Sequence, residues 1–414
     1  MKFLSNIIPD KSHTFSKAYH QYPVGHAPEV IKQADGVKVF TDKGVFLDWS
    51  MGLGPVIKGY NFEKLNTHIF NRISKGFAFS IPSDYEFQVA EKLLSELSFG
   101  DSVRFAKNGS DVTSAAVRLA RFYTKKNHVI CNGYHGWQDW YIGSTTRRHG
   151  VPNDVAELTH KINGFDEVDL ENKFKEFGDK TACLILEPMI ADQPNITFLN
   201  KAKQLCKKYN TLLVFDECWT GFRCHKRGAI GLTKIKPDLS CYAKALGNGV
   251  PVSAIVGNKK IMSGFEEVFF SFTHSSDPFG LAAAEFMLDY LDESFFAALS
   301  IKTNNLYESI QNEIEKIKVP EYKLNASFYP GKIVISAKNP KFSLNLKTFI
   351  QKELLKDKIL FNMFFAVAED HSIRDIDQTI LSLKRIIKKL NSQNLDILKE
   401  TNKILVKPVF RVQS

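Results

Sequence analysis

The 414 residues of this chain are enough to bury more than one hydrophobic core, so the length predicts two or three domains. Hydrophobic residues make up 44% and charged residues 24%, which is typical of a soluble globular protein and excludes wholesale disorder. The formal net charge of +10 favours anionic partners. Because the lysines are dispersed and no basic run alternates with aromatic residues, we expect small anionic molecules or simply a basic surface, and no nucleic acid.

The six cysteines include no Cys-x-x-Cys pair, and several lie in apolar, strand-like contexts, as reduced buried thiols do. Cys218, Cys224 and His225 are close in sequence, but their spacing matches no common zinc site, so no metal is expected. Residues 1–15 are a poor signal peptide, and the apolar stretch 361–368 is too short to span a bilayer. These features predict a cytoplasmic protein without a membrane partner.

Residues 1–50 predict an irregular arm followed by a β-hairpin. Two strand-like segments, 36–40 and 45–49, flank a Thr-Asp-Lys-Gly turn. The glycine-rich segment 50–60 follows the hairpin. It contains Gly-x-Gly but lacks a third glycine and continues directly into a proline, so it does not indicate a dinucleotide site.

Two helices are predicted in the next part of the chain. The first covers 84–97, and its buried face is expected to contain Phe87, Ala90, Leu93, Leu94 and Leu97. The second follows a short strand at 103–106 and begins at Gly109-Ser110, with Ser110 expected as its N-cap. Free N–H groups at such a helix start suit a phosphate, although an ordinary capped helix has the same pattern.

Four further strand-like segments each end near a polar or aromatic group. The groups are Tyr134 with His135, Glu187, Asp216 and Lys244. Helical segments such as 199–209 separate the strands, and this alternation indicates a mainly parallel sheet. Because ligands of such sheets bind at the carboxyl ends of the strands, we expect these groups to lie together.

Lys244 ends an apolar run and is followed by small and turn-forming residues. This is how a Schiff-base lysine is usually presented, although most lysines at strand ends are solvated surface charges. Asp216 and the helix start at Gly109-Ser110 strengthen the interpretation of Lys244 as a Schiff-base lysine. Together the three motifs supply the imine partner, the pyridinium counter-ion and the phosphate cradle that pyridoxal phosphate requires.

On these motifs the sequence resembles the class III (fold type I) pyridoxal-phosphate aminotransferases, and within them the glutamate-1-semialdehyde aminomutase-like branch. The matching blocks are Asn-Gly-Ser at 108–110, Tyr-His-Gly at 134–136, Asp-Glu-x-x-Thr-Gly-Phe-Arg at 216–223 and Tyr-Ala-Lys at 242–244. The resemblance covers about residues 30 to 390. It implies an α/β fold with three parts: an N-terminal arm and hairpin (1–50) that packs with the small domain, a large cofactor-binding domain (51–291) with a mainly parallel seven-stranded sheet, and a small α+β domain (292–414).

The resemblance also implies the site residues. Lys244 would form the Schiff base with the cofactor and later move a proton, while Asp216 would hold the proton on the ring nitrogen. The implied cofactor-binding residues are Gly109, Ser110, Tyr134, His135, Glu187, Asp192, Asp216, Cys218, Lys244 and Thr273. Trp49, Ser50 and Gly52 are expected on the substrate side. Thr273 falls where the family threonine reaches the phosphate of the other subunit's cofactor, which implies a homodimer with shared active sites.

The sequence departs from the family pattern at several positions. Cys218 stands where the family usually has a valine, and Asp192 stands where aminomutase-like relatives have an asparagine. Residues 22–27 lack the arginine that binds the substrate carboxylate in glutamate-1-semialdehyde aminomutases. The tail 391–414 extends beyond the usual family end, and the sequence offers no function for it.

Three functions remain open. The first is an aminotransferase that moves an amino group from a donor amino acid to an aldehyde or ketone, such as a precursor of a sugar or polysaccharide. The second is an intramolecular aminomutase of the glutamate-1-semialdehyde type. The third is a non-catalytic or regulatory protein on the same fold, which the intact pair of Lys244 and Asp216 disfavours. The sequence identifies neither the donor, the acceptor nor the pathway.

Overall fold

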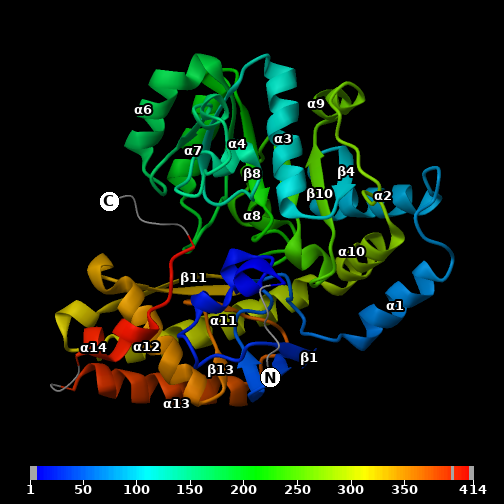
Figure 1. Cartoon of the computed structure of the whole chain (residues 1–414). Coiled ribbons are helices and arrows are strands. Elements are labelled where there is room, and N and C mark those ends of the chain that lie inside the picture. Colours follow the sequence, from blue (N-terminus) through cyan, green and yellow to red (C-terminus); the bar gives the residue numbers. More distant parts are fainter. Residues whose placement is uncertain (1–6, 393–395, 410–414) are drawn as a thin grey trace. The chain divides into compact units, whose positions relative to one another are not determined.

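The structure is a computed structural model that describes residues 7–392 and 396–409 (Figure 1). The chain forms two compact units: one contains Glu63–Phe296, and the other contains the described residues up to Phe62 and from Ala297 onward. The divisions therefore lie near residues 62 and 296, whereas the sequence analysis places them at 50 and 291. Segment 50–62 belongs with the hairpin because Ile57 and Lys58 accept backbone hydrogen bonds from Glu369 and Asp370.

The unit Glu63–Phe296 is built on a seven-stranded sheet, as the sequence predicts. Its strands are β4 (Ser102–Ala106), β5 (His128–Asn132), β6 (Thr159–Lys161), β7 (Thr181–Leu186), β8 (Leu212–Glu217), β9 (Leu239–Tyr242) and β10 (Ser253–Gly257). Their order is β4-β10-β9-β8-β7-β5-β6, and only β10 runs antiparallel to its neighbours. Every residue of β7, β8 and β9 is buried, as expected for central strands whose two faces are both covered.

Helices of this unit pack against the sheet and each other. They are α1 (Glu63–Ile73), α2 (Asp84–Leu97), α3 (Gly109–Thr124), α4 (Asp139–Ile142), α5 (Asn153–Ala156), α6 (Glu167–Phe177), α7 (Ile196–Lys208), α8 (Gly228–Thr233), α9 (Lys259–Met262) and α10 (Pro278–Tyr290). Helix α3 contacts β7, β8, β9 and β10, and α7 contacts β7 and β8. None of the described helices is long and apolar enough to cross a membrane.

The buried face of α2 differs from the prediction. Leu93 and Leu97 are buried as expected, but Tyr85 and Val89 complete the face, while Phe87 is 63% exposed. The buried positions follow a four-residue spacing, which forms one stripe along a helix, and Phe87 lies outside that stripe.

The N-cap predicted for α3 is also wrong. The cap is Asn108, whose backbone N–H donates to the carboxylate of Asp111 (2.7 Å). Ser110 therefore lies inside the first turn of the helix. As a result, the backbone N–H groups of Gly109 and Ser110 are at the open end of α3, where intrahelical acceptors are lacking.

The second unit combines segments from the two ends of the chain. Its first sheet has the order β1-β2-β3-β13, with β1 (Ile31–Asp35), β2 (Lys38–Thr41), β3 (Gly44–Asp48) and β13 (Ile359–Leu360). Its second sheet has the order β11-β12-β14, with β11 (Leu324–Tyr329), β12 (Lys332–Ala337) and β14 (Phe364–Ala366). The longer helices are α11 (Glu293–Ile314), which starts in the first unit, α12 (Ser343–Lys356) and α13 (Ile373–Leu390). Parallel pairing of β3 with β13 joins the N-terminal hairpin to the C-terminal part of the chain.

The described part of the tail packs within this second unit. Helix α14 (Ile397–Thr401) contacts α12, and Thr401 accepts a hydrogen bond from Asn345 (2.8 Å). Farther along, the carbonyl of Lys407 accepts from Gln21 (2.9 Å). The tail therefore has a structural role in covering α12.

Candidate active site

The sheet brings the predicted polar groups to one edge. Strand pairing places Leu186 beside Phe215 and Glu217 beside Tyr242. Glu187, Asp216 and the segment leading to Lys244 therefore leave the sheet at neighbouring carboxyl ends. This is the edge at which parallel α/β sheets bind ligands.

Asp216 is a buried carboxylate at this edge whose two oxygens both accept hydrogen bonds. Its Oδ2 lies 2.8 Å from Nδ1 of His135, and its Oδ1 accepts the backbone N–H of Cys218 (3.0 Å). Burial alone raises the pKa of a carboxyl group, but the hydrogen bond and charge of His135, the Cys218 side chain and the charge of Lys244 lower the pKa of Asp216 overall. Asp216 is therefore a carboxylate at neutral pH.

His135 is held from several sides. Since a carboxylate only accepts hydrogen bonds, Nδ1 of His135 carries a proton and donates the hydrogen bond to Asp216. The His135 carbonyl accepts from the hydroxyl of Thr113 (2.8 Å), and its ring stacks on Trp140 with the centroids 6.0 Å apart. These contacts fix the position of His135, and the hydrogen bond from His135 in turn orients the Asp216 carboxylate.

Lys244 begins a short 3-10 turn, Lys244–Gly247, directly after β9. Its φ of 47° lies in the left-handed region, which costs a non-glycine residue energy and is often found at functional sites. Its ammonium nitrogen lies 5.1 Å from the centre of the Trp219 ring, within the range of a cation–π contact. The side chain is partly buried, and its charge lowers the pKa of Asp216 and offsets part of the rise that burial causes in the pKa of Cys218.

The start of α3 lies against the loop that follows Asp216. A Cβ on Gly109 would come within 2.8 Å of the Cys218 sulfur, so only glycine fits there. A Cβ on Gly136 would meet the Cβ of Ser110 at 2.5 Å, which brings the Tyr-His-Gly turn against the same helix start. Within the described residues, no acceptor receives the backbone N–H of Gly109 or Ser110. These N–H groups are available to an anion.

Tyr134 and Glu187 form the neighbouring contact at the edge. The backbone N–H of Tyr134 donates to Oε1 of Glu187 (2.7 Å). The Tyr134 side chain is 51% exposed, so its ring is accessible to a ligand. A side chain on Gly133 would collide with Glu187, which explains why a glycine precedes the tyrosine.

The structure also identifies a residue for which the sequence analysis assigned no role. Glu217 is fully buried, and its carboxylate accepts from the N–H of Ala229 (2.8 Å) and the hydroxyl of Thr220 (2.5 Å). It thereby closes the loop that carries Cys218 and Trp219. Burial raises the pKa of Glu217 to about 7. Its place directly after Asp216 on an apolar strand was the only sequence signal.

Two other predicted site residues, Asp192 and Thr273, are exposed. Asp192 accepts the backbone N–H of Gln193 (3.0 Å), and Thr273 lies on a turn. Neither has a recorded contact with the cluster among the described residues.

Trp49, Ser50 and Gly52 belong to the other compact unit. Trp49 is fully buried there, stacks on His371 with the centroids 3.9 Å apart and donates to the hydroxyl of Thr379 (2.9 Å). Ser50 is also buried, and its N–H donates to Asp48 (2.7 Å). Gly52 has a φ of 66°, which glycine tolerates readily. Their contact with substrate stays a prediction.

Comparison with known proteins places this arrangement in a family. The profile of the family described as Aminotransferase class-III matches residues 19–324. A glutamate-1-semialdehyde 2,1-aminomutase from Francisella philomiragia is 30% identical over 398 residues, covering 86% of this chain and 90% of the relative. An enzyme of the same name from Legionella pneumophila is 32% identical over 367 residues, covering 83% of each chain.

Solved structures show the same fold. An omega-transaminase from Sphaerobacter thermophilus superimposes with a TM-score of 0.85 at 18% identity, covering 94% of this chain and 96% of that one. A glutamate-1-semialdehyde aminomutase from Pseudomonas aeruginosa has a TM-score of 0.78 at 16% identity, with 90% of each chain covered. Together with the family profile and the two relatives, this establishes that the chain belongs to the class III aminotransferases, a family of pyridoxal-phosphate-dependent enzymes.

Proposed function

We propose that this enzyme is an aminotransferase that moves an amino group from a donor amino acid to an aldehyde or ketone acceptor, with Lys244 as its central catalytic residue. The observation that carries the proposal is the meeting of Lys244 with the hydrogen-bonded pair of Asp216 and His135 at one sheet edge. An amine beside a fixed carboxylate is what amino-group chemistry on a pyridine cofactor requires.

The residues present fit pyridoxal phosphate. The open N–H groups of Gly109 and Ser110 would hold its phosphate, and the exposed ring of Tyr134 would cover its ring. Asp216 would keep the ring nitrogen protonated, since a carboxylate favours the charged form of an adjacent base. Cys218 would supply a small apolar surface, because burial raises the pKa of its thiol well above the usual value. Glu187 would act through the Tyr134 backbone that it anchors.

When bound, the protonated cofactor withdraws electrons from the carbon that carries the amino group. The protein must then remove a proton from that carbon and deliver one to the acceptor. Lys244 carries an amine at this edge that can do both. His135 holds Asp216 in place through its Nδ1 proton, so the charge of the carboxylate stays directed at one point.

An intramolecular aminomutase is the second candidate, and the name shared by the two relatives at 30% and 32% identity favours it. Against it, residues 22–27 contain no arginine to bind the substrate carboxylate in the way that the glutamate-1-semialdehyde enzymes do. We retain the aminotransferase as the first proposal for this reason. Membership in an enzyme family leaves the non-catalytic alternative without support.

Two further parts of the proposal concern the state of the protein. Exposed Thr273 suits a contact with the cofactor of a partner subunit, and we propose a homodimer with shared active sites. The six cysteines are all buried and free, which suits a reducing compartment, and we propose a cytoplasmic location. Asp192 and the segment 49–52 remain proposed cofactor and substrate contacts.

The test begins with the absorption spectrum of the purified protein, followed by borohydride reduction and peptide mapping. We expect a yellow protein in which reduction fixes the cofactor to the peptide containing Lys244. A colourless protein that stays colourless after cofactor is added would refute the proposal.

A panel of amino acids then separates the two reactions. Loss of the long-wavelength band with a donor such as glutamate, together with release of the corresponding keto acid, selects the aminotransferase. Loss of the band only with a diamine or an amino-aldehyde selects the aminomutase.

A further inference from the structure

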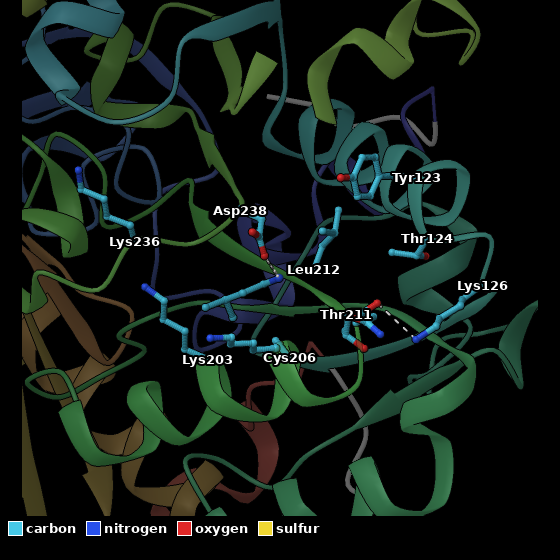
Figure 2. A pocket seen from close by; sticks show the side chains of 12 residues that line it. Tyr123, Thr124, Lys126, Lys203, Cys206, Thr211, Leu212, Lys236 and Asp238 are labelled. Carbon is cyan, nitrogen blue, oxygen red and sulfur yellow. Dashed lines mark hydrogen bonds between the residues drawn. The ribbon is translucent and has the colours of Figure 1, made fainter. Parts of the chain in front are cut away.

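A lysine-rich hollow lies in the unit Glu63–Phe296 at the amino ends of β8 and β9, the edge opposite to the candidate active site. Its volume is about 680 Å³, within the range of sites for small molecules. Residues from α3, α7 and the loops before β8 and β9 line it, and Figure 2 shows Lys203 and Lys236 on one side of Asp238 and Tyr123, Thr124 and Lys126 on the other.

The charge of the lining is strongly one-sided. Lys126, Lys203, Lys207 and Lys236 line the hollow, against one carboxylate, Asp238. In the whole chain the ratio is much more even, with 55 basic and 45 acidic residues. The hollow is therefore more basic than the composition alone would produce.

Two of these charges are already engaged. Lys126 donates to the carbonyls of Tyr209 (2.5 Å) and Asn210 (3.3 Å) and holds the chain before β8. Asp238 accepts the backbone N–H of Leu213 (2.8 Å), and burial raises its pKa. Both side chains build the wall of the hollow.

Lys203, Lys207 and Lys236 make no hydrogen bond or ion pair with any described residue. Lys203 and Lys207 are four residues apart on α7, so they project from the same side of the helix and repel each other. Lys207 lies in the last turn of α7, where a basic residue is favoured by the helix dipole. The charge of Lys203 acts on the Asp238 carboxyl and lowers its pKa in part, and Figure 2 shows Lys203 and Lys236 on the same side of Asp238.

We propose that this hollow binds the polyphosphate group of a small molecule, at a site separate from the amino-transfer site. Four lysines that line one hollow against a single carboxylate match a ligand with several negative charges. The 38% exposed side chain of Tyr123 lines the hollow as well and offers a surface for a flat ring. Nucleotides and simpler polyphosphates share the charged group that the lysines would recognise.

The site is independent of the proposed reaction because none of its lining residues belongs to the cluster around Lys244. Strands β8 and β9 separate the two, with Asp216 near the end of β8 and Leu212 at its start. Binding at the hollow can therefore be measured whatever the enzyme transfers.

The experiment uses the holoenzyme, so that cofactor already fills its own phosphate site. Binding of tripolyphosphate is measured by calorimetry at low salt for the wild type and for Lys203→Gln with Lys236→Gln. We expect saturable binding at one site per chain that the double variant weakens at least fivefold, because two of the three unpaired charges are removed. Added salt should weaken the wild type more than the variant.

The matched control is Lys384→Gln with Lys388→Gln, which removes two exposed lysines four residues apart on α13, outside the hollow. The control should bind tripolyphosphate as the wild type does. Equal weakening in both double variants would overturn the proposal, because it would show attraction to general positive charge. Absence of saturable binding to the wild type would overturn it as well. Unchanged thermal unfolding of the variants verifies that the comparison concerns folded protein.

A parallel titration with ATP distinguishes the two ligand sources. If the ligand is a nucleotide, ATP should bind more tightly than tripolyphosphate, and Tyr123→Ala should remove that advantage. If a simpler polyphosphate is bound, the two probes should bind equally, and Tyr123→Ala should affect neither. If Lys203→Gln with Lys236→Gln weakens the binding of neither ATP nor tripolyphosphate, the proposed site is contradicted.

Discussion

The two edges of the seven-stranded sheet use charge in opposite ways, although β8 and β9 contribute to both. At the carboxyl edge, Asp216 is buried and both of its oxygens accept hydrogen bonds. At the amino edge, Lys203 and Lys236 are exposed and have no ion-pair partner among the described residues. The carboxyl edge thus fixes Asp216 by hydrogen bonds, whereas Lys203 and Lys236 at the amino edge have none with described residues.

This difference corresponds to two kinds of task. A catalytic group must keep one orientation and one protonation state, and buried hydrogen bonds provide both at modest cost. A binding site for a multiply charged anion needs net charge more than fixed geometry, and flexible lysines supply it. The comparison predicts large effects on chemistry from single substitutions at the carboxyl edge and graded effects on binding at the amino edge.

Lys244→Ala should have the largest effect. Removing the amine eliminates both the covalent attachment of cofactor and the proton transfer, so we expect turnover to fall by roughly 10³-fold or more. Steady-state kinetics with the donor found in the amino-acid panel measures this. Full turnover in the variant would remove Lys244 from the centre of the mechanism.

Lys234→Ala is the matched control for this change. Lys234 also has a left-handed backbone conformation, with a φ of 61°, and stands at the C-cap of α8. Alanine carries the same left-handed backbone strain as lysine at either position, so the backbone alone should cost neither variant stability. Only Lys244→Ala should lose the absorption band of attached cofactor.

Asp216→Ala should have the next largest effect. Without the carboxylate, the ring nitrogen loses the group that keeps it protonated, and His135 loses its hydrogen-bond partner. We expect weaker cofactor binding and a loss of activity of roughly 10²- to 10³-fold. Cofactor titration and kinetics check the two parts separately. A near-normal rate at saturating cofactor would exclude Asp216 from the chemistry.

Glu217→Gln tests how burial acts on the carboxylate next to Asp216. Because the pKa of Glu217 is raised from 4.5 to about 7 in the folded protein, the folded state binds a proton that the unfolded state has lost between these pH values. Stability from this group is fully present below pH 4.5 and is lost as the pH rises through 7. The loss amounts to about 3 kcal/mol at 1.36 kcal/mol per pH unit.

Urea unfolding of wild type and Glu217→Gln at several pH values measures this contribution. Relative to the variant, the wild type should lose about 3 kcal/mol of unfolding free energy between pH 4.5 and 7. Identical pH dependence of the two proteins would show that Glu217 does not change its protonation in this range.

The sequence was sufficient to predict which groups meet at the carboxyl edge, because their positions depend on local strand patterns and on the order of parallel strands. A strand that ends in Asp216 and a strand that leads to Lys244 must converge when both run parallel in one sheet. The same reasoning could not place Asp192 or Thr273, whose positions depend on irregular loops. It also missed the capping role of Asn108, because Ser110 is an equally good capping residue by type.

The amino edge could not be predicted from the sequence. Lys126, Lys203 and Lys236 are far apart along the chain, and their dispersion appeared to argue against a concentrated basic site. The fold gathers them because α3, α7 and the loop before β9 all end at the same edge. Spacing along a chain is therefore weak evidence against a site whose parts come from different elements.

Thr273→Ala should have the smallest effect and sharpens the comparison at the carboxyl edge. Thr273 is exposed and makes no hydrogen bond with the cluster among the described residues, so its proposed role is to hold the cofactor of a partner subunit. One lost hydrogen bond to a charged phosphate should weaken cofactor binding roughly tenfold. Equilibrium dialysis of cofactor measures this at two protein concentrations, one at which the protein is a dimer and one dilute enough for the dimer to dissociate. If sites are shared, the wild type should lose affinity on dilution while the variant changes less. Unchanged affinity in the variant would mean that each chain holds its cofactor alone.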